Sequence, residues 1–176
     1  GAGPGITTNP STQTICAGSN VTFTSAATGA LSQQWQVSTD GGTTWNNVAG
    51  QTAATYTITG AIASLNNNRY RCVFTGQCNT SNSNAAILTV QTAPSLTAQP
   101  AGVNICTGTN TTFTVTATGS ALAYQWELST NGGTSYSAIG GATTDSYTVS
   151  NAAVSQNNNR YRCVVSGACP AAITSN

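Results

Sequence analysis

Residues 66–72 read Asn-Asn-Asn-Arg-Tyr-Arg-Cys, and the same seven residues return unchanged at positions 157–163. The chain is therefore a tandem repeat, in which a polar, asparagine-rich turn leads twice into a strand. All the positive charge of the 176 residues lies in these two segments, on Arg69, Arg71, Arg160 and Arg162. Whatever function the repeat has, it performs with very little charge.

The scarcity of ionisable side chains excludes several classes of function. Histidine is absent, charged residues make up 4% of the sequence, and the acids are Asp40, Glu127 and Asp145. Acid–base or nucleophilic catalysis needs paired carboxylates, or a base beside a serine or cysteine, so we expect no enzyme, metal site or cofactor. A net charge of +1 gives no basic field for nucleic acid. Without a long apolar run or a signal peptide, we expect a mature fragment with no membrane insertion.

Alternation of apolar and polar residues predicts β-strands in both copies. Residues 20–25 alternate with period two, as a half-buried strand does, and residues 110–115 repeat the pattern. Further strands are expected around Trp35 and Trp126 and around two Tyr-Thr pairs, at residues 33–37, 124–128, 54–58 and 145–149. The chain is therefore expected to be ordered and all-β.

The turn, the Tyr-x-Cys motif and the tryptophan together resemble an immunoglobulin (Ig)-type β-sandwich. The resemblance implies that Tyr70 and Tyr161 form the corner before strand F, bonded to upstream backbone, and that Trp35 and Trp126 are core residues of strand C. Asn66 and Asn157 are expected to cap the turn. Ser25 and Val115 stand where an antibody-type strand B carries its cysteine, so Cys72 and Cys163 are expected to be buried thiols.

We therefore predict two tandem Ig-like β-sandwich domains. The predicted boundaries are a linker at 1–5, domain 1 at 6–91, a linker at 92–95 and domain 2 at 96–176. In the first copy the last strand is expected at 83–90, and the second copy stops where the equivalent strand begins. The missing strand could come from following residues or from another chain.

Three cysteines per copy cannot all pair within one domain. In Ig topology Cys16 lies at the end of domain 1 that leads to domain 2, and Cys78 lies in a hairpin roughly 20 Å away, too far for a disulfide. We predict a Cys16–Cys169 bridge between the domains, with Cys78 and Cys106 pairing to neighbouring repeats. Cys16–Cys72 and Cys16–Cys78 are the alternatives. Disulfides favour an extracellular setting, at the cell surface or secreted.

Residues 38–45 match the Asp-box of sialidase-like propellers, Ser-x-Asp-x-Gly-x-x-Trp. The second copy has Asn131 in place of the acid and Tyr136 in place of Trp45. The Gly-Gly pair and the loss of the acid favour a hairpin turn with no catalytic role. Trp45 and Tyr136 are candidates for ligand contact.

Four motifs are found in both copies: the Cys-x-Gly opening, Gln-Trp-x-x-Ser-Thr-x-Gly-Gly-Thr, Asn-Arg-Tyr-Arg-Cys and Thr-Ser-Asn. Through these motifs, both copies resemble the Ig-like repeats of large secreted surface proteins of Bacteroidota. The resemblance covers nearly all of both copies. It implies an adhesin or extracellular fibre, exported by a gliding-associated route. The leading interpretation is a structural module that stacks on neighbouring repeats or like subunits. The alternatives are a binding module for surface glycan or protein and, far behind, a sialidase-type enzyme.

Overall fold

The computed structural model describes residues 3–176, which divide into two compact units at the boundary between Gln91 and Thr92. Gly1 and Ala2, part of the first predicted linker, lie outside the described residues. Gly5 and Ser95, the last residues of the two predicted linkers, already belong to strands. The linkers are therefore shorter than the sequence indicated.

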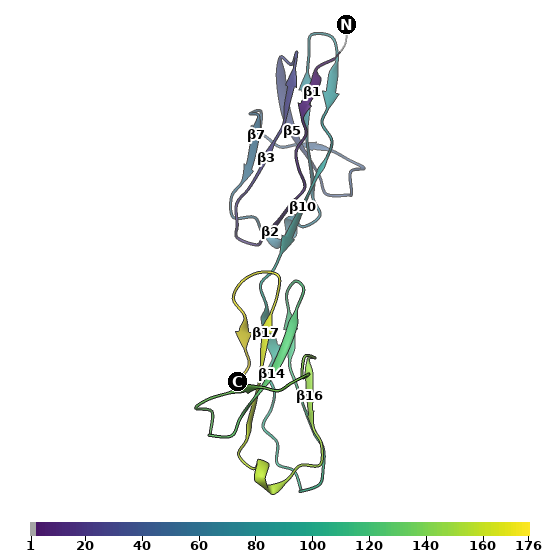
Figure 1. Cartoon of the computed structure of the whole chain (residues 1–176). Coiled ribbons are helices and arrows are strands. Elements are labelled where there is room, and N and C mark those ends of the chain that lie inside the picture. The colour runs from purple at the N-terminus through teal and green to yellow at the C-terminus, as the bar shows by residue number, and fades with distance from the viewer. Residues whose placement is uncertain (1–2) are drawn as a thin grey trace. The chain divides into compact units, whose positions relative to one another are not determined.

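The described strands of unit 1 belong to three sheets, joined by turns, loops and one 3-10 turn (Figure 1). The largest has the order β2-β10-β8-β5-β6, with β9 also paired to β8, and the others pair β1 with β4 and β3 with β7. The elements are β1 (Gly5–Thr8), β2 (Gln13–Cys16), β3 (Val21–Thr24), β4 (Ala26–Thr28), β5 (Ser32–Ser38), β6 (Asn46–Asn47), β7 (Thr55–Ile58), the 3-10 turn η1 (Ala63–Leu65), β8 (Arg69–Thr75), β9 (Thr80–Asn82) and β10 (Ala86–Gln91).

The core of unit 1 lies between these sheets and is aromatic. Phe23 stacks on Tyr70 with ring centroids 4.9 Å apart, and Trp35 packs against Phe23 at 6.4 Å. All three side chains are buried, and the Trp35 indole N–H donates to the carbonyl of Ala53 at 2.9 Å. Because inward residues alternate with exposed threonines along β3, the period-two pattern of the sequence becomes the inner face of the sandwich.

The asparagine-rich turn closes the sandwich differently from the sequence prediction. The Tyr70 hydroxyl lies 3.5 Å from the side-chain amide of Asn68, instead of bonding to upstream backbone. Asn66 does not cap its own turn, because its side-chain oxygen accepts from the backbone N–H of Val90 in β10 at 2.9 Å. Asn67 takes the left-handed conformation, with φ 67°. The turn therefore binds the last strand, β10, through the side chain of Asn66.

Unit 2 repeats this plan except for the strands equivalent to β2 and β10. Its elements are β11 (Ser95–Ala98), β12 (Thr111–Thr114), β13 (Thr116–Thr118), β14 (Ala123–Ser129), β15 (Ser137–Ala138), β16 (Ser146–Val149), η2 (Val154–Gln156), β17 (Arg160–Ser166) and β18 (Ile173–Thr174). β14 pairs with β17 over the same seven-residue register that joins β5 to β8. No described residue of unit 2 forms a counterpart of β10, or of β2, which pairs with β10 in unit 1.

The predicted last strand of unit 1 differs at its start. The sequence indicated residues 83–90, whereas β10 covers Ala86–Gln91. Ser83 instead lies beside β8, between β9 and β10, and its hydroxyl accepts from the backbone N–H of Cys72 at 2.9 Å. Ser175 makes the same contact with Cys163 in unit 2. β18 is thus the counterpart of β9.

Candidate functional site

The loop that resembles an Asp-box is a hairpin turn organised by Asp40. The carboxylate accepts from the Ser38 hydroxyl at 2.7 Å and from the backbone N–H groups of Thr43 and Thr44 at 3.1 and 2.9 Å. Gly41 and Gly42 take positive φ angles, 76° and 97°, which glycine adopts at little cost. These three bonds to the carboxylate end on Oδ1, and the Thr44 N–H and hydroxyl also donate to Oδ2, so both carboxylate oxygens hold the turn.

In unit 2 an uncharged side chain does the same work. Asn131 accepts from the Ser129 hydroxyl at 2.9 Å and from the backbone N–H of Ser135 at 3.0 Å, and its amide donates to the Ser135 hydroxyl at 2.7 Å. Because asparagine supports the same turn, the acid is not needed for the loop's conformation. The exchange supports a structural role for this position.

Acid should weaken unit 1 through Asp40. Hydrogen bonds from Thr44 and Ser38 lower the pKa of Asp40 below its ordinary value. The unfolded chain therefore takes up a proton first as the pH falls, and the stabilisation, full above about pH 4, is lost toward the lower folded pKa. We expect Asp40→Asn to flatten the decline of unit 1 stability between pH 4 and pH 2. Urea unfolding across this range measures it, and an unchanged slope in the variant would contradict the assignment.

Each unit carries a stacked arginine and aromatic ring on the outer face of its largest sheet. In unit 1 the Arg71 guanidinium carbon lies 4.2 Å from the centroid of Trp45, and its Nε donates to the Gln36 side chain at 2.9 Å. The Trp45 indole N–H donates to the carbonyl of Gly42 at 3.0 Å. Trp45 is half-buried, so the ring predicted as a ligand contact is held by its own unit.

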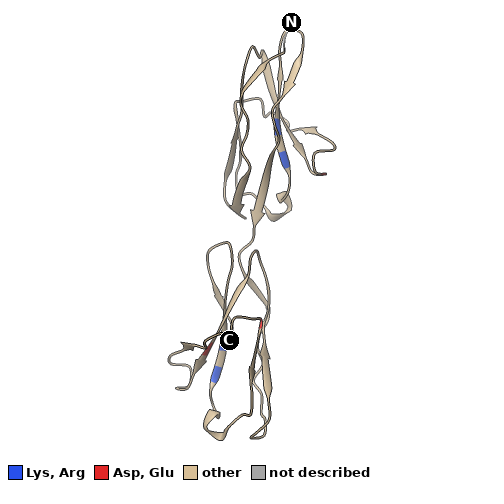
Figure 2. Ribbon diagram, turned by 45° about the vertical axis from the view of Figure 1, so that its right-hand side comes forward, with Lys and Arg blue, Asp and Glu red and all other residues tan. Residues whose placement is uncertain are grey.

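In unit 2 the same arrangement includes an ion pair. Arg162 lies 3.7 Å from the centroid of Tyr136, and its Nε donates to Glu127 at 2.7 Å. Figure 2 shows the basic residues as a short segment on one strand of each unit. Paired in this way, Arg162 and Glu127 supply neither a free acid nor a free cation.

Among the described residues, no group of three or more potential metal-ligating side chains lies together.

The six cysteines fall into three states. Cys16, at the end of β2, and Cys169, between β17 and β18, are disulfide-bonded. Cys72 and Cys163 are fully buried thiols, and burial raises the pKa of Cys72 to about 11 and also raises that of Cys163. The remaining thiols, Cys78 and Cys106, are exposed.

Alkylation should separate the two kinds of thiol. Iodoacetamide at pH 8 should modify Cys78 and Cys106 quickly, whereas Cys72 and Cys163 should react about a thousandfold more slowly, because the thiolate forms only when the unit opens. Mass spectrometry of digested samples measures the modification at each position. Cys78→Ser is the control, since it should remove one fast site and leave the slow ones unchanged. Equal rates at all four positions would contradict the burial.

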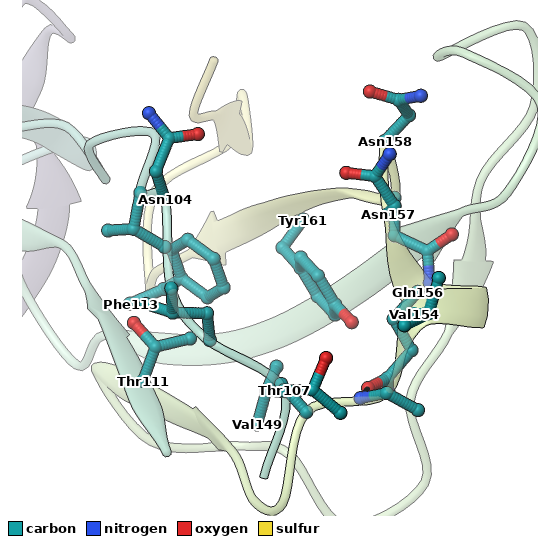
Figure 3. A pocket seen from close by; sticks show the side chains of 15 residues that line it. Asn104, Thr107, Thr111, Phe113, Val149, Val154, Gln156, Asn157, Asn158 and Tyr161 are labelled. Atoms are coloured by element: carbon teal, nitrogen blue, oxygen red, sulfur yellow. Dashed lines mark hydrogen bonds between the residues drawn. The ribbon is translucent and has the colours of Figure 1, made fainter. Parts of the chain in front are cut away.

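Unit 2 has an open groove where unit 1 has β10. Two adjoining hollows of about 310 and 450 Å³ share Phe113, Tyr161 and the asparagines 157–159 in their walls. Figure 3 shows the rings of Phe113 and Tyr161 facing the hollow, with Asn157 and Asn158 on one side and Asn104 on the other. Both rings are half-buried, whereas their counterparts in unit 1, Phe23 and Tyr70, are buried.

Solved structures that resemble the chain include tandem Ig domains. The two Ig domains of DIP-gamma match with a TM-score of 0.71 over 99% of this chain and 95% of theirs, at 15% identity. An I-band fragment of titin matches with a TM-score of 0.72 over 99% of this chain and 64% of its own, also at 15% identity. The chain is therefore a pair of tandem Ig-like domains. At this identity the likeness concerns the fold alone.

The chain belongs to the family described as "Domain of unknown function (DUF8696)", whose model matches twice, at residues 5–92 and 97–176. A curated relative, Endoglucanase C of Cellulomonas fimi, is 36% identical over 134 residues. The match covers 74% of this chain and only 12% of that protein. The chain thus resembles a small part of a much longer protein.

No described helix is long and apolar enough to cross a membrane.

Proposed function

We propose that this chain is a structural repeat module of an extracellular bacterial surface fibre, filament or adhesin stalk, and that its repeats join end to end. The observation that carries the proposal is the state of the cysteines. Cys16 and Cys169 are disulfide-bonded, whereas Cys106 and Cys78, which hold the same places in the other copy, are exposed thiols. In a module of this kind, one cysteine of each copy is already in a disulfide, and one exposed thiol of each copy can form a disulfide with a neighbouring repeat.

The proposed connectivity is Cys16–Cys169 within the chain, with Cys78 and Cys106 bonded to a preceding and a following repeat. Disulfides persist in oxidising compartments, which supports an extracellular location. The low charge removes long-range repulsion between like modules. No catalytic role is proposed, since Asp40 is used by its turn and Glu127 by Arg162.

Peptide mapping without reductant tests the linkages. A Cys16–Cys169 peptide is expected from the isolated chain, and further peptides joining Cys78 to Cys106 are expected from longer native material. Electron microscopy of that material should show a periodic fibre. Recovery of Cys16–Cys72 or Cys16–Cys78 would overturn the connectivity, and discrete particles would count against the fibre.

A binding module for glycans is the second candidate. It is favoured by the half-buried Trp45 and Tyr136 and by the match to part of Endoglucanase C, a protein named for action on glucan. Protein aromatic rings can bind sugars through their apolar faces. Pull-down on cellulose and glycan arrays tests this function. Saturable binding that Trp45→Ala weakens about tenfold, with Trp45→Phe close to the parent chain, would favour the binding module over the stalk.

A further inference from the structure

We propose that Arg69 and Arg71, on the outer face of the largest sheet of unit 1, bind the carboxylate groups of an acidic polysaccharide, a polymer of uronic acid units. The inference rests on the second candidate function, glycan binding, and deepens it by naming the class of glycan and the residues that select it. Unit 2 carries the same two arginines but neutralises one of them.

The two arginines lie on the same face of β8. Arg69 and Arg71 are half-buried and alternate with the buried residues Tyr70 and Cys72, so both side chains point away from the core. Residues two apart on a strand are separated by about 6.6–6.8 Å. One extended ligand can therefore contact both guanidinium groups.

Arg71 is held in place by uncharged partners. Its guanidinium carbon lies 4.2 Å from the centroid of Trp45, and its Nε donates to the Gln36 side chain at 2.9 Å. The Gln36 amide in turn donates to Asn47 at 2.9 Å. These contacts leave the two Nη nitrogens of Arg71 as a pair of donors, which is the geometry that matches a carboxylate. Because the side chain is already fixed, it loses little freedom when a ligand binds.

Arg69 supplies a second cation. No described residue forms an ion pair or a hydrogen bond with its guanidinium. Its Cδ and Nη1 atoms lie 3.7 Å from the position that a Cβ on Gly42 would occupy, and Trp45 lies 3.8 Å from the same position, so Arg69 packs beside the loop that carries the ring. Asp40 pairs with neither arginine, because its carboxylate holds the turn. The site therefore keeps its positive charge.

Unit 2 shows how the same scaffold loses this charge. Glu127 stands in the place of Gln36, and its carboxylate accepts from Arg162 Nε at 2.7 Å. Ala138 takes the place of Asn47, so the neutral network of unit 1 is replaced by an ion pair. With two arginines and one acid, unit 1 has a net charge of +1, whereas unit 2, with two of each, has none. A carboxylate ligand would also meet repulsion from Glu127.

The neighbouring side chains favour a polysaccharide over other polyanions. Nucleic acids are bound through many phosphate contacts, and unit 1 has only two cations. An acidic protein segment would use the arginines but not the exposed hydroxyl and amide groups beside Trp45, which can bond to sugar hydroxyls. These groups belong to Thr43, Thr44, Asn46 and Asn47. A uronic acid polymer uses both the cations and the neutral polar groups.

Affinity electrophoresis of the full chain in gels that contain polygalacturonate tests the site, with mobility normalised to a gel without polymer. We expect retardation that weakens as salt is added, because salt screens exposed charges. Arg69→Gln should weaken binding at least about tenfold, since it removes a charged donor. Gln36→Glu should do the same, because it places the carboxylate of unit 2 beside Arg71. Arg160→Gln is the matched control, since it removes the same charge from the equivalent position of unit 2 and should leave binding unchanged.

Unfolding midpoints close to that of the parent chain establish that the variants are folded. Equal weakening by Arg69→Gln and Arg160→Gln would overturn the site, because binding would then follow net charge alone. Retardation by neutral hydroxyethylcellulose but not by polygalacturonate would overturn the acidic class and leave glycan binding in place. Retardation by neither polymer would reject both. Equal affinity for polyglutamate would assign the arginines to an acidic protein segment and overturn the polysaccharide.

Discussion

Trp35→Ala is expected to destabilise unit 1 by about 3–5 kcal/mol, the range for removing a large aromatic side chain from a packed core. The ring is 0% exposed and packs against Phe23 and Tyr56 at 6.4 and 6.1 Å. Removal also leaves the carbonyl of Ala53 without its indole donor. Since small domains are stable by only about 5–15 kcal/mol, unit 1 should lose a large share of its stability.

Urea unfolding followed by the amide NMR signals of each unit measures the loss, with unit 2 as an internal reference. Trp45→Ala is the matched control, because it removes the same side chain from the same unit at a half-buried site. Its loss of the Arg71 stack and of one hydrogen bond should cost about 1–2 kcal/mol. Equal costs for the two variants would show that Trp35 is not a core residue.

The sequence predicted the fold because its pattern is local and occurs twice. Alternation identified the inward face of β3, and the tryptophans and Tyr-x-Cys motifs identified the strands that form the core. The Ig-like class of both units, supported by the solved structures, therefore followed from residues near one another in the chain. The expectation that the chain is not an enzyme also came from the sequence alone, because it has only three acidic residues.

The role of Asn66 could not be predicted from its neighbours, because its partner Val90 lies 24 residues away on another strand. A side-chain acceptor in a turn is equally suited to capping that turn. The stack of Arg71 on Trp45 was missed for a similar reason. The stack forms because the loop that carries Trp45 crosses the sheet near Arg71, and alternation of apolar and polar residues does not predict the path of a loop.

The proposed Cys16–Cys169 disulfide should make the chain almost inextensible under force. Residues 17–168 lie between the two cysteines, so tension applied at the termini passes through the disulfide instead of through that segment. In single-molecule pulling without reductant, we expect only the short terminal segments to lengthen. After reduction, each unit should unfold separately and release roughly 250–300 Å, given about 3.3–3.6 Å per extended residue.

The Cys16→Ser/Cys169→Ser double variant provides the control, because it should show both unfolding steps with no reductant present. Cys72→Ser leaves the proposed linkage intact, so in that variant the chain should stay short whatever the cost of placing a hydroxyl at this buried position. Two full unfolding steps in the oxidised parent chain would rule out a bond that encloses both units. One step alone would instead place the disulfide within a single unit and leave the other to bear the load. The number of steps before reduction therefore distinguishes a linkage between domains, which suits a stalk, from one that only stabilises a domain.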